Sequence, residues 1–203
     1  MKIKIIFFTF LLAGCFTKAQ KTMPPPPPIL EEDRIDNDFS KFSLSKRLAA
    51  YPFRKAARIK LVSFNLNHDF RPPTVFLDSS VVIEEKEEVL MSKVMKSGDF
   101  SKLDQMQDLN PDQIAKLSDI LYNTCARHYI TSGAQMGCYY PRNAILFLDK
   151  SNKIFEYFEV CFGCRGIETN KKFPLLDEYI CNFMYDDLEK YFNELGIETK
   201  SRI

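Results

Sequence analysis

A hairpin built on one uninterrupted apolar run constrains the fold of this chain more than any other feature. Ala144 to Leu148 reads AILFL without a polar residue, and such a run is typical of a strand that is covered on both faces. The turn-forming residues DKSN follow at 149–152, and Ile154 to Cys161 (IFEYFEVC) supplies the returning strand. The sequence therefore predicts an antiparallel hairpin buried at the centre of a domain.

Two amphipathic helices are predicted to cover the sheet that contains this hairpin. The stretch from Asn110 to Gln113 (NPDQ) offers a capping residue, a proline at the first helical position and a capping box. Asp177 to Leu195 carries apolar residues at spacings of three and four. Arg58 to Phe64 and Thr74 to Ile83 are predicted as strands, while Glu88 to Met95 is ambiguous between strand and helix. This order predicts an α+β domain, an antiparallel sheet of about four to five strands with two helices packed on one face.

The first nineteen residues are typical of a bacterial export signal. Lys2 and Lys4 precede a mostly apolar, uncharged run from Ile5 to Gly14, which is too short to span a bilayer. The run ends in LAGC, which resembles a lipobox with Cys15 as the lipidated residue, whereas ordinary cleavage after Ala19 is the alternative. We expect an exported protein of the cell envelope, either lipid-anchored or periplasmic.

A proline-rich linker follows the signal. Pro24 to Pro28 are consecutive prolines, which favour an extended polyproline II spacer of roughly 15 Å. The stretch from Ile29 to Asp38 is acidic and polar and continues the linker. We therefore expect a signal peptide at 1–19, a linker at 20–38 and a single globular domain at 39–203, long enough to bury its own core.

Charge is distributed unevenly along the chain, although the formal net charge is only +1. No acidic residue occurs from Phe39 to His68, and this stretch holds seven cations: Lys41, Lys46, Arg47, Arg54, Lys55, Arg58 and Lys60. An acidic cluster lies at Glu84, Glu85, Glu87 and Glu88. We interpret the two as solvated faces that pair with each other. The alternative is a basic patch that meets anionic lipid or an acidic partner; no motif indicates nucleic acid.

The cysteines form the main candidate site. With Phe147 placed opposite Ile154, the open end of the hairpin brings Cys138 beside Cys161 and Cys164. In an oxidising compartment we expect one disulfide from Cys138 to either partner. The remaining cysteines, Cys125 and Cys181, are expected to be buried thiols on or near apolar helix faces.

Two other interpretations of these cysteines stay open. Cys125 and His128 have C-x-x-H spacing and Cys161 and Cys164 have C-x-x-C spacing, which together with Cys138 resembles a structural zinc site. The C-x-x-C pair is also the spacing of a thiol-redox motif, although Gly163 favours a turn here rather than the helix start such motifs require. Zinc is thus the one cofactor that the sequence allows as an alternative to none.

Polar residues of the hairpin supply the remaining candidates. Arg142 is expected to pair with Glu159, and the alternative is that its guanidinium contacts an anionic ligand. Glu156 and Glu159 should lie on opposite faces of their strand, solvated or ion-paired. Nucleophile-elbow, phosphate-loop and HExxH motifs are all missing from the sequence, so no catalytic residues are predicted.

The residues CYYPRN from Cys138, the turn FLDKSNK and the segment EVCFGC ending at Cys164 resemble a bacterial family of small exported proteins without an assigned activity. That family carries C-Y-x-P-R-[NH] and [IL]-E-[IV]-C-F-x-C around such a hairpin, and the resemblance covers roughly Pro111 to Leu195. It implies that the cysteine cluster is a family feature. The sequence predicts a non-enzymatic, lipid-anchored binding or structural domain, held to the membrane by its N-terminal lipid, with any protein partner open. The alternative is a thiol-redox or zinc-dependent envelope protein that uses the CFGC pair.

Overall fold

The computed structural model describes residues 39–68, 88–128, 138–176 and 180–200. All of them belong to one compact unit, Glu31–Ile203. The predicted signal peptide, the linker and the predicted strand at Thr74 to Ile83 lie outside the described residues.

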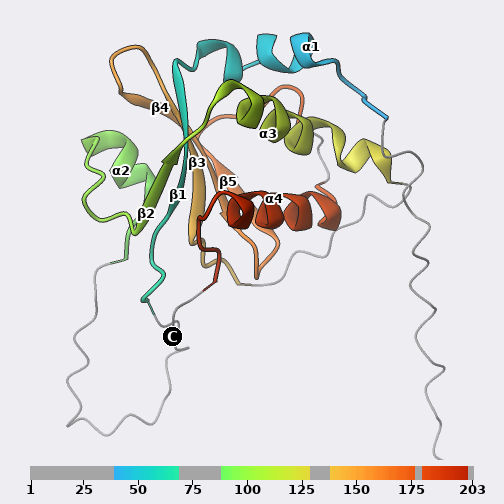
Figure 1. Cartoon of the computed structure of the whole chain (residues 1–203). Helices are drawn as coiled ribbons and strands as arrows, with labels where there is room; N and C mark the ends of the chain where they lie inside the picture. Colours follow the sequence, from blue (N-terminus) through green and yellow to red (C-terminus); the bar gives the residue numbers. More distant parts are fainter. Residues whose placement is uncertain (1–38, 69–87, 129–137, 177–179, 201–203) are drawn as a thin grey trace, which may run out of the picture. The chain divides into compact units, whose positions relative to one another are not determined.

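A five-stranded antiparallel sheet forms the centre of the domain, in the order β2-β1-β3-β4-β5 (Figure 1). Its strands are β1 (Arg58–Ser63), β2 (Gln105–Asp108), β3 (Asn143–Leu148), β4 (Ile154–Cys161) and β5 (Gly166–Thr169). Every residue of β3 is buried, because this strand is central and both of its faces are covered. The α+β class and the hairpin of β3 and β4 are therefore confirmed, while β2 and β5 were not expected.

The register of the hairpin differs slightly from the expected one. Leu148, not Phe147, lies opposite Ile154, and Phe147 pairs with Glu156 across an irregularity between Phe147 and Leu148. The turn itself is held by Asp149, whose carboxylate accepts the backbone N–H groups of residues 151 and 153 at 2.8 and 3.0 Å. A turn residue with positive φ, Asn152 at 59°, fits the tolerance of asparagine for that region.

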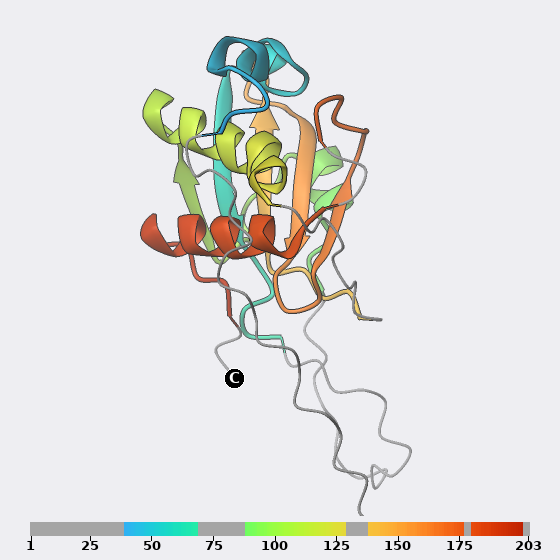
Figure 2. The same ribbon diagram turned by 90° about the vertical axis from the view of Figure 1, so that its right-hand side faces the viewer.

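Two long helices cover one face of the sheet, as expected (Figure 2). They are α3 (Pro111–Asn123), which has the predicted capping box between Asn110 and Gln113, and α4 (Asn182–Glu194). The prediction placed the start of the second helix too early, because Cys181 already has the extended backbone of an N-cap. A large apolar core lies between these helices and the sheet.

Smaller elements complete both faces. Helix α1 (Leu44–Ala49) and the short 3-10 helix η1 (Phe53–Lys55) lie beside α3, and a second 3-10 helix, η2 (Cys125–Arg127), follows α3. Helix α2 (Met91–Ser97) lies on the opposite face over a second, smaller core (Figure 2). The ambiguous segment is therefore helical from Met91, and the sheet is covered on both sides.

Candidate functional site

Three free thiols meet where β4 ends. Cys161 is the last residue of β4, and the chain then turns through Gly163 to Cys164 before β5 begins. The Cys138 thiol hydrogen-bonds with that of Cys164, and Cys164 also contacts the thiol of Cys161. This confirms the expected proximity of the three cysteines. The expected disulfide among them is not formed, and all three are free in the structure.

The chemistry of this thiol cluster (Cys138, Cys161 and Cys164) follows from its surroundings. Burial raises the pKa of the Cys164 thiol, and the hydrogen bond with Cys164 raises the pKa of Cys138, which is itself exposed. Thiols with a raised pKa are protonated at neutral pH and are weak nucleophiles and metal ligands. The turn after Cys161 supplies no helix N-terminus that would lower these values.

The disulfide of this structure joins Cys125 to Cys181, with their Cα atoms 5.5 Å apart. The expectation that both are buried free thiols is therefore wrong. The chain after α3 turns through η2, which brings Cys125 to the residue that caps α4, and the backbone N–H of Cys181 lies 3.0 Å from the Cys125 sulfur. The two cysteines are 56 residues apart in the sequence. Their pairing depends on how α3 and α4 pack together, so it could not be predicted from the sequence.

The C-x-x-H pair does not form a metal centre in this arrangement. Cys125 is committed to the disulfide, and the ring of His128 stacks on Phe183 with centroids 3.6 Å apart. Across the described ranges, no group of three or more His, Cys, Asp or Glu side chains is arranged to hold a metal ion.

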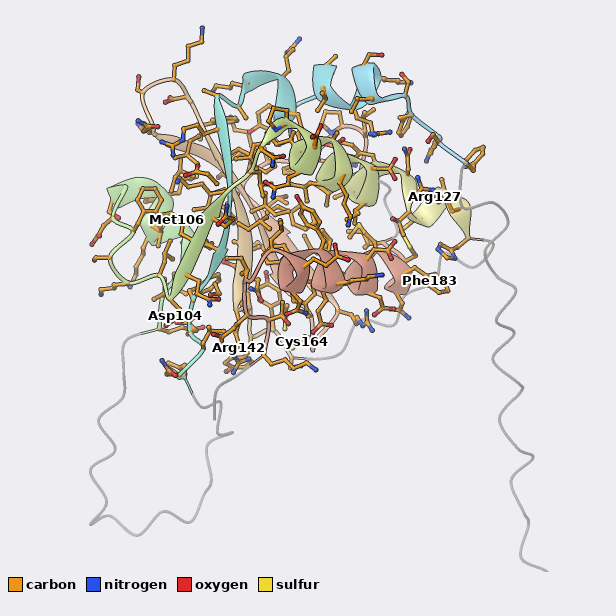
Figure 3. The ribbon with its side chains drawn as sticks, in the orientation of Figure 1. Asp104, Met106, Arg127, Arg142, Cys164 and Phe183 are labelled. Atoms are coloured by element: carbon orange, nitrogen blue, oxygen red, sulfur yellow. A yellow bond between two sulfur atoms is a disulfide. The ribbon has the colours of Figure 1, made fainter. Side chains whose placement is uncertain are left out.

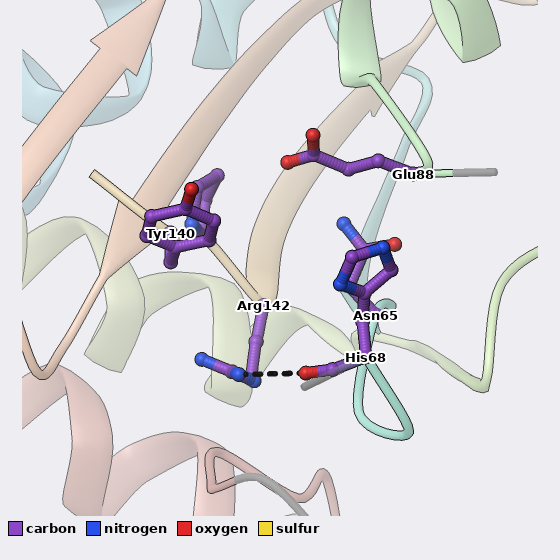
Figure 4. A pocket seen from close by; sticks show the side chains of 6 residues that line it. Asn65, His68, Glu88, Tyr140 and Arg142 are labelled. Carbon is purple, nitrogen blue, oxygen red and sulfur yellow. Dashed lines mark hydrogen bonds between the residues drawn. The ribbon is translucent and has the colours of Figure 1, made fainter. Parts of the chain in front are cut away.

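Arg142 lines a small pocket beside the thiol cluster (Figure 4). Its Nη2 donates to the backbone carbonyl of His68 at 3.1 Å, so the expected pairing with Glu159 is wrong. Its Nε is buried without a hydrogen-bond partner among the described residues. The other lining residues are Asn65, His68, Glu88, Tyr140 and Pro141. The cavity volume of about 10 Å³ has room for one water molecule rather than an organic ligand.

Two buried glutamates on β4 were predicted to be solvated or ion-paired, and this was wrong. Glu156 is 0% exposed and accepts the Tyr51 hydroxyl at 2.5 Å, together with the backbone N–H groups of Tyr157 and Asn170, each at 2.9 Å. The prediction that it lies on the opposite face from Glu159 agrees with their different partners. Alternation along the strand predicts on which face of the sheet each glutamate lies. That both glutamates are buried becomes clear only from the structure, in which both faces of the sheet are covered.

Glu159 is 7% exposed and lies next to the thiol cluster. It accepts the hydroxyl of Tyr139, the neighbour of Cys138, at 3.1 Å. Burial, opposed by the Tyr139 hydrogen bond and assisted by the negative charge of Glu168 on β5, raises the pKa of Glu159 to about 7. A neutral carboxyl at this position is therefore favoured in mildly acidic solution.

The predicted lipidation site, Cys15, lies outside the described residues. Within the part of the chain that the structure describes, no helix is both long and apolar enough to cross a membrane. No family model, curated protein or solved structure matches this chain.

Proposed function

We propose that the chain is an exported cell-envelope domain, anchored by a lipid on Cys15, that acts by binding rather than by catalysis. The observation that carries this proposal is the thiol cluster, which is placed to clamp the segment before β3 onto the end of β4. The export signal and the lipobox in the sequence support the location. The resemblance to a family of small exported bacterial proteins supports the same assignment.

Cys138 and Cys164 are free thiols in the structure, and the clamp closes when the oxidising envelope converts this pair to a disulfide. Cys138 is exposed and first forms a mixed disulfide with a protein-disulfide oxidant of the envelope. The Cys164 sulfur then attacks the Cys138 sulfur and releases the oxidant as a dithiol. Two thiol protons and two electrons leave the clamp, and one S–S bond forms. Because the pKa values of both thiols are raised, the uncatalysed reaction is slow and the oxidant determines whether the clamp closes.

A thiol-redox or zinc function for the CFGC pair is less well supported. A catalytic C-x-x-C motif needs a lowered thiol pKa, whereas that of Cys164 is raised. A structural zinc site needs four ligands in a tetrahedral arrangement, and among the described residues no three His, Cys, Asp or Glu side chains, the thiol cluster included, are arranged to hold a metal ion.

Intact mass of the protein from membrane and soluble envelope fractions tests the anchor. A lipid-sized increment on Cys15 is expected in the membrane fraction. Cleavage after Ala19 without an increment would overturn the anchor and leave the clamp untouched.

Alkylation with and without reductant tests the clamp. In protein isolated from the envelope, Cys138 and Cys164 should alkylate only after reduction. Cys138→Ser should free Cys164, whereas the matched variant Cys161→Ser should leave the result unchanged. Three thiols that alkylate without reductant, or stoichiometric bound zinc, would contradict the clamp.

A further inference from the structure

Three separate segments rich in lysine and arginine lie at the end of the sheet opposite the thiol cluster (Figures 1 and 2). The segments are residues 44–58, which hold α1, η1 and the first residue of β1, then the β3–β4 turn, and the loop after β5. Arg58 Nη1 donates to Asn152 Oδ1 at 3.1 Å, which joins the first segment to the turn. The rings of Tyr51 and Phe173, 6.3 Å apart, join it to the loop. The exposed cations of this basic end are Lys46, Arg54, Lys55, Arg58, Lys150, Lys153, Lys171 and Lys172.

Few acidic groups balance the basic end. Within residues 44–58, 149–153 and 170–173, Asp149 is the only acidic residue, and its carboxylate is used by the backbone of its own turn. Asp108 on β2 pairs with Arg58 at 2.7 Å and also with the largely buried Lys60. The acidic cluster was expected to pair with the basic stretch. Of this cluster the structure describes only Glu88, which lines the Arg142 pocket instead. Among the described residues, the cations of the basic end therefore outnumber the acidic groups beside them.

Apolar side chains accompany these cations where the domain begins. Leu44 is 44% exposed and Phe39 is 47% exposed. The ammonium groups of Lys41 and Lys46 lie over the ring of Phe42, 5.4 and 4.6 Å from its centroid. Exposed apolar residues between lysines are typical of surfaces that rest at the boundary of lipid headgroups and acyl chains. An acidic protein would match the charges but would leave Leu44 without a counterpart.

We propose that the basic end docks onto an anionic lipid surface, with Leu44 at the headgroup boundary. The proposal deepens the proposed function, because it rests on export and anchoring. Residues 16–38 separate Cys15 from Phe39, and a chain of this length reaches at most about 80 Å. An anchored domain thus meets the membrane at high effective concentration, and individually weak contacts suffice. Docking orients the thiol cluster and the Arg142 pocket away from the membrane, because they lie at the other end of the sheet (Figure 3).

The test uses a chain that begins at Gln20, which lacks Cys15 but retains the whole compact unit Glu31–Ile203. Its binding is measured by co-sedimentation with vesicles of 30% phosphatidylglycerol in phosphatidylcholine and with pure phosphatidylcholine, at low and high salt. Binding to the anionic vesicles alone, and its loss at high salt, is expected. Each cation at a membrane surface changes binding by about fivefold. A variant with glutamine at Lys150, Lys153, Lys171 and Lys172 should therefore bind about 600-fold more weakly.

The matched control replaces four exposed lysines elsewhere and so has the same net charge. It carries glutamine at Lys93, Lys96, Lys102 and Lys190 and should retain most of the binding. Equal losses in the two variants would show a net-charge effect and overturn the proposal. Equal binding to both vesicle types, or binding to polyglutamate but not to vesicles, would also overturn it. None of these outcomes bears on lipidation, which the mass of the full chain decides.

Discussion

Replacement of Glu159 by glutamine should stabilise the domain above neutral pH and have little effect in acid. The Glu159 carboxyl is almost fully buried, and its nearest donors are the Tyr139 hydroxyl and the backbone N–H of Met91. The acidic groups that face it are Glu168, directly opposite on β5, and Glu88. The negative charges of Glu168 and Glu88 both disfavour a negative charge at Glu159, so ionisation of Glu159 lowers the stability of the native state.

The magnitude and its sign follow from the pKa of Glu159. Burial raises this pKa from 4.5 to about 7, so the native state holds a proton that the unfolded chain has already released. The associated stabilisation is fully present below about pH 4.5 and is lost as the pH rises through 7. A difference of about 2.5 pKa units, at about 1.4 kcal/mol each, corresponds to about 3 kcal/mol of unfolding free energy.

Urea unfolding of the parent and of Glu159→Gln at two pH values measures this effect. At pH about 4 the amide resembles the protonated carboxyl, and the two proteins should have nearly equal stability. At pH about 8 the variant should be more stable by up to about 3 kcal/mol, because it no longer has to ionise in the interior. The matched control is the exposed neighbour Glu168→Gln, which should shift stability in the same direction by less than about 1 kcal/mol.

A difference between parent and Glu159→Gln that is the same at both pH values would refute this reasoning. Such a result would mean that Glu159 is ionised in the native state throughout the range. The comparison of two proteins at each pH removes the titration of all other groups from the result.

Three further changes have expected effects on the free energy of unfolding. Reduction of the Cys125–Cys181 disulfide, which spans 56 residues, should cost about 4 kcal/mol by the loop-entropy relation, and calorimetry with and without reductant measures it. Tyr51→Phe should cost about 1 to 3 kcal/mol, because the buried Glu156 loses its hydroxyl donor; an unchanged urea midpoint would contradict this. Asn110→Ala should cost about 1 kcal/mol through loss of the capping box, whereas an equal effect of the neighbouring exposed Asp112→Ala would argue against a specific cap.

Local pattern determined the main elements of the fold. The apolar run of β3 and the DKSN turn specify a hairpin, because strand alternation and turn chemistry act over a few residues. The cap at Asn110 specifies where α3 begins for the same reason. The proximity of Cys138 to Cys164 also followed, since the strands of a hairpin bring its two flanks together.

Weak local signals explain the elements that the sequence did not reveal. Strands β2 and β5 are short edge strands, and neither has the apolar alternation that marks a strand within the sequence. They form because β1 and β4 present unpaired backbone groups along their outer sides. The hairpin register also differs by one residue from the predicted one, because the pairing of β3 with β4 is irregular between Phe147 and Leu148. The turn sequence does not predict this irregularity.

Long-range packing decided the features that bear most on function. The Cys125–Cys181 disulfide depends on the start of η2 meeting the start of α4, a contact that no spacing rule predicts. The burial of Glu156 and Glu159 depends on helices covering both faces of the sheet, whereas alternation gives only the face. The basic end also arises only when a turn and a loop far along the chain fold next to α1 and η1. The sequence alone determined the local elements, because these depend on neighbouring residues, while the sites were decided by contacts between residues far apart in the chain.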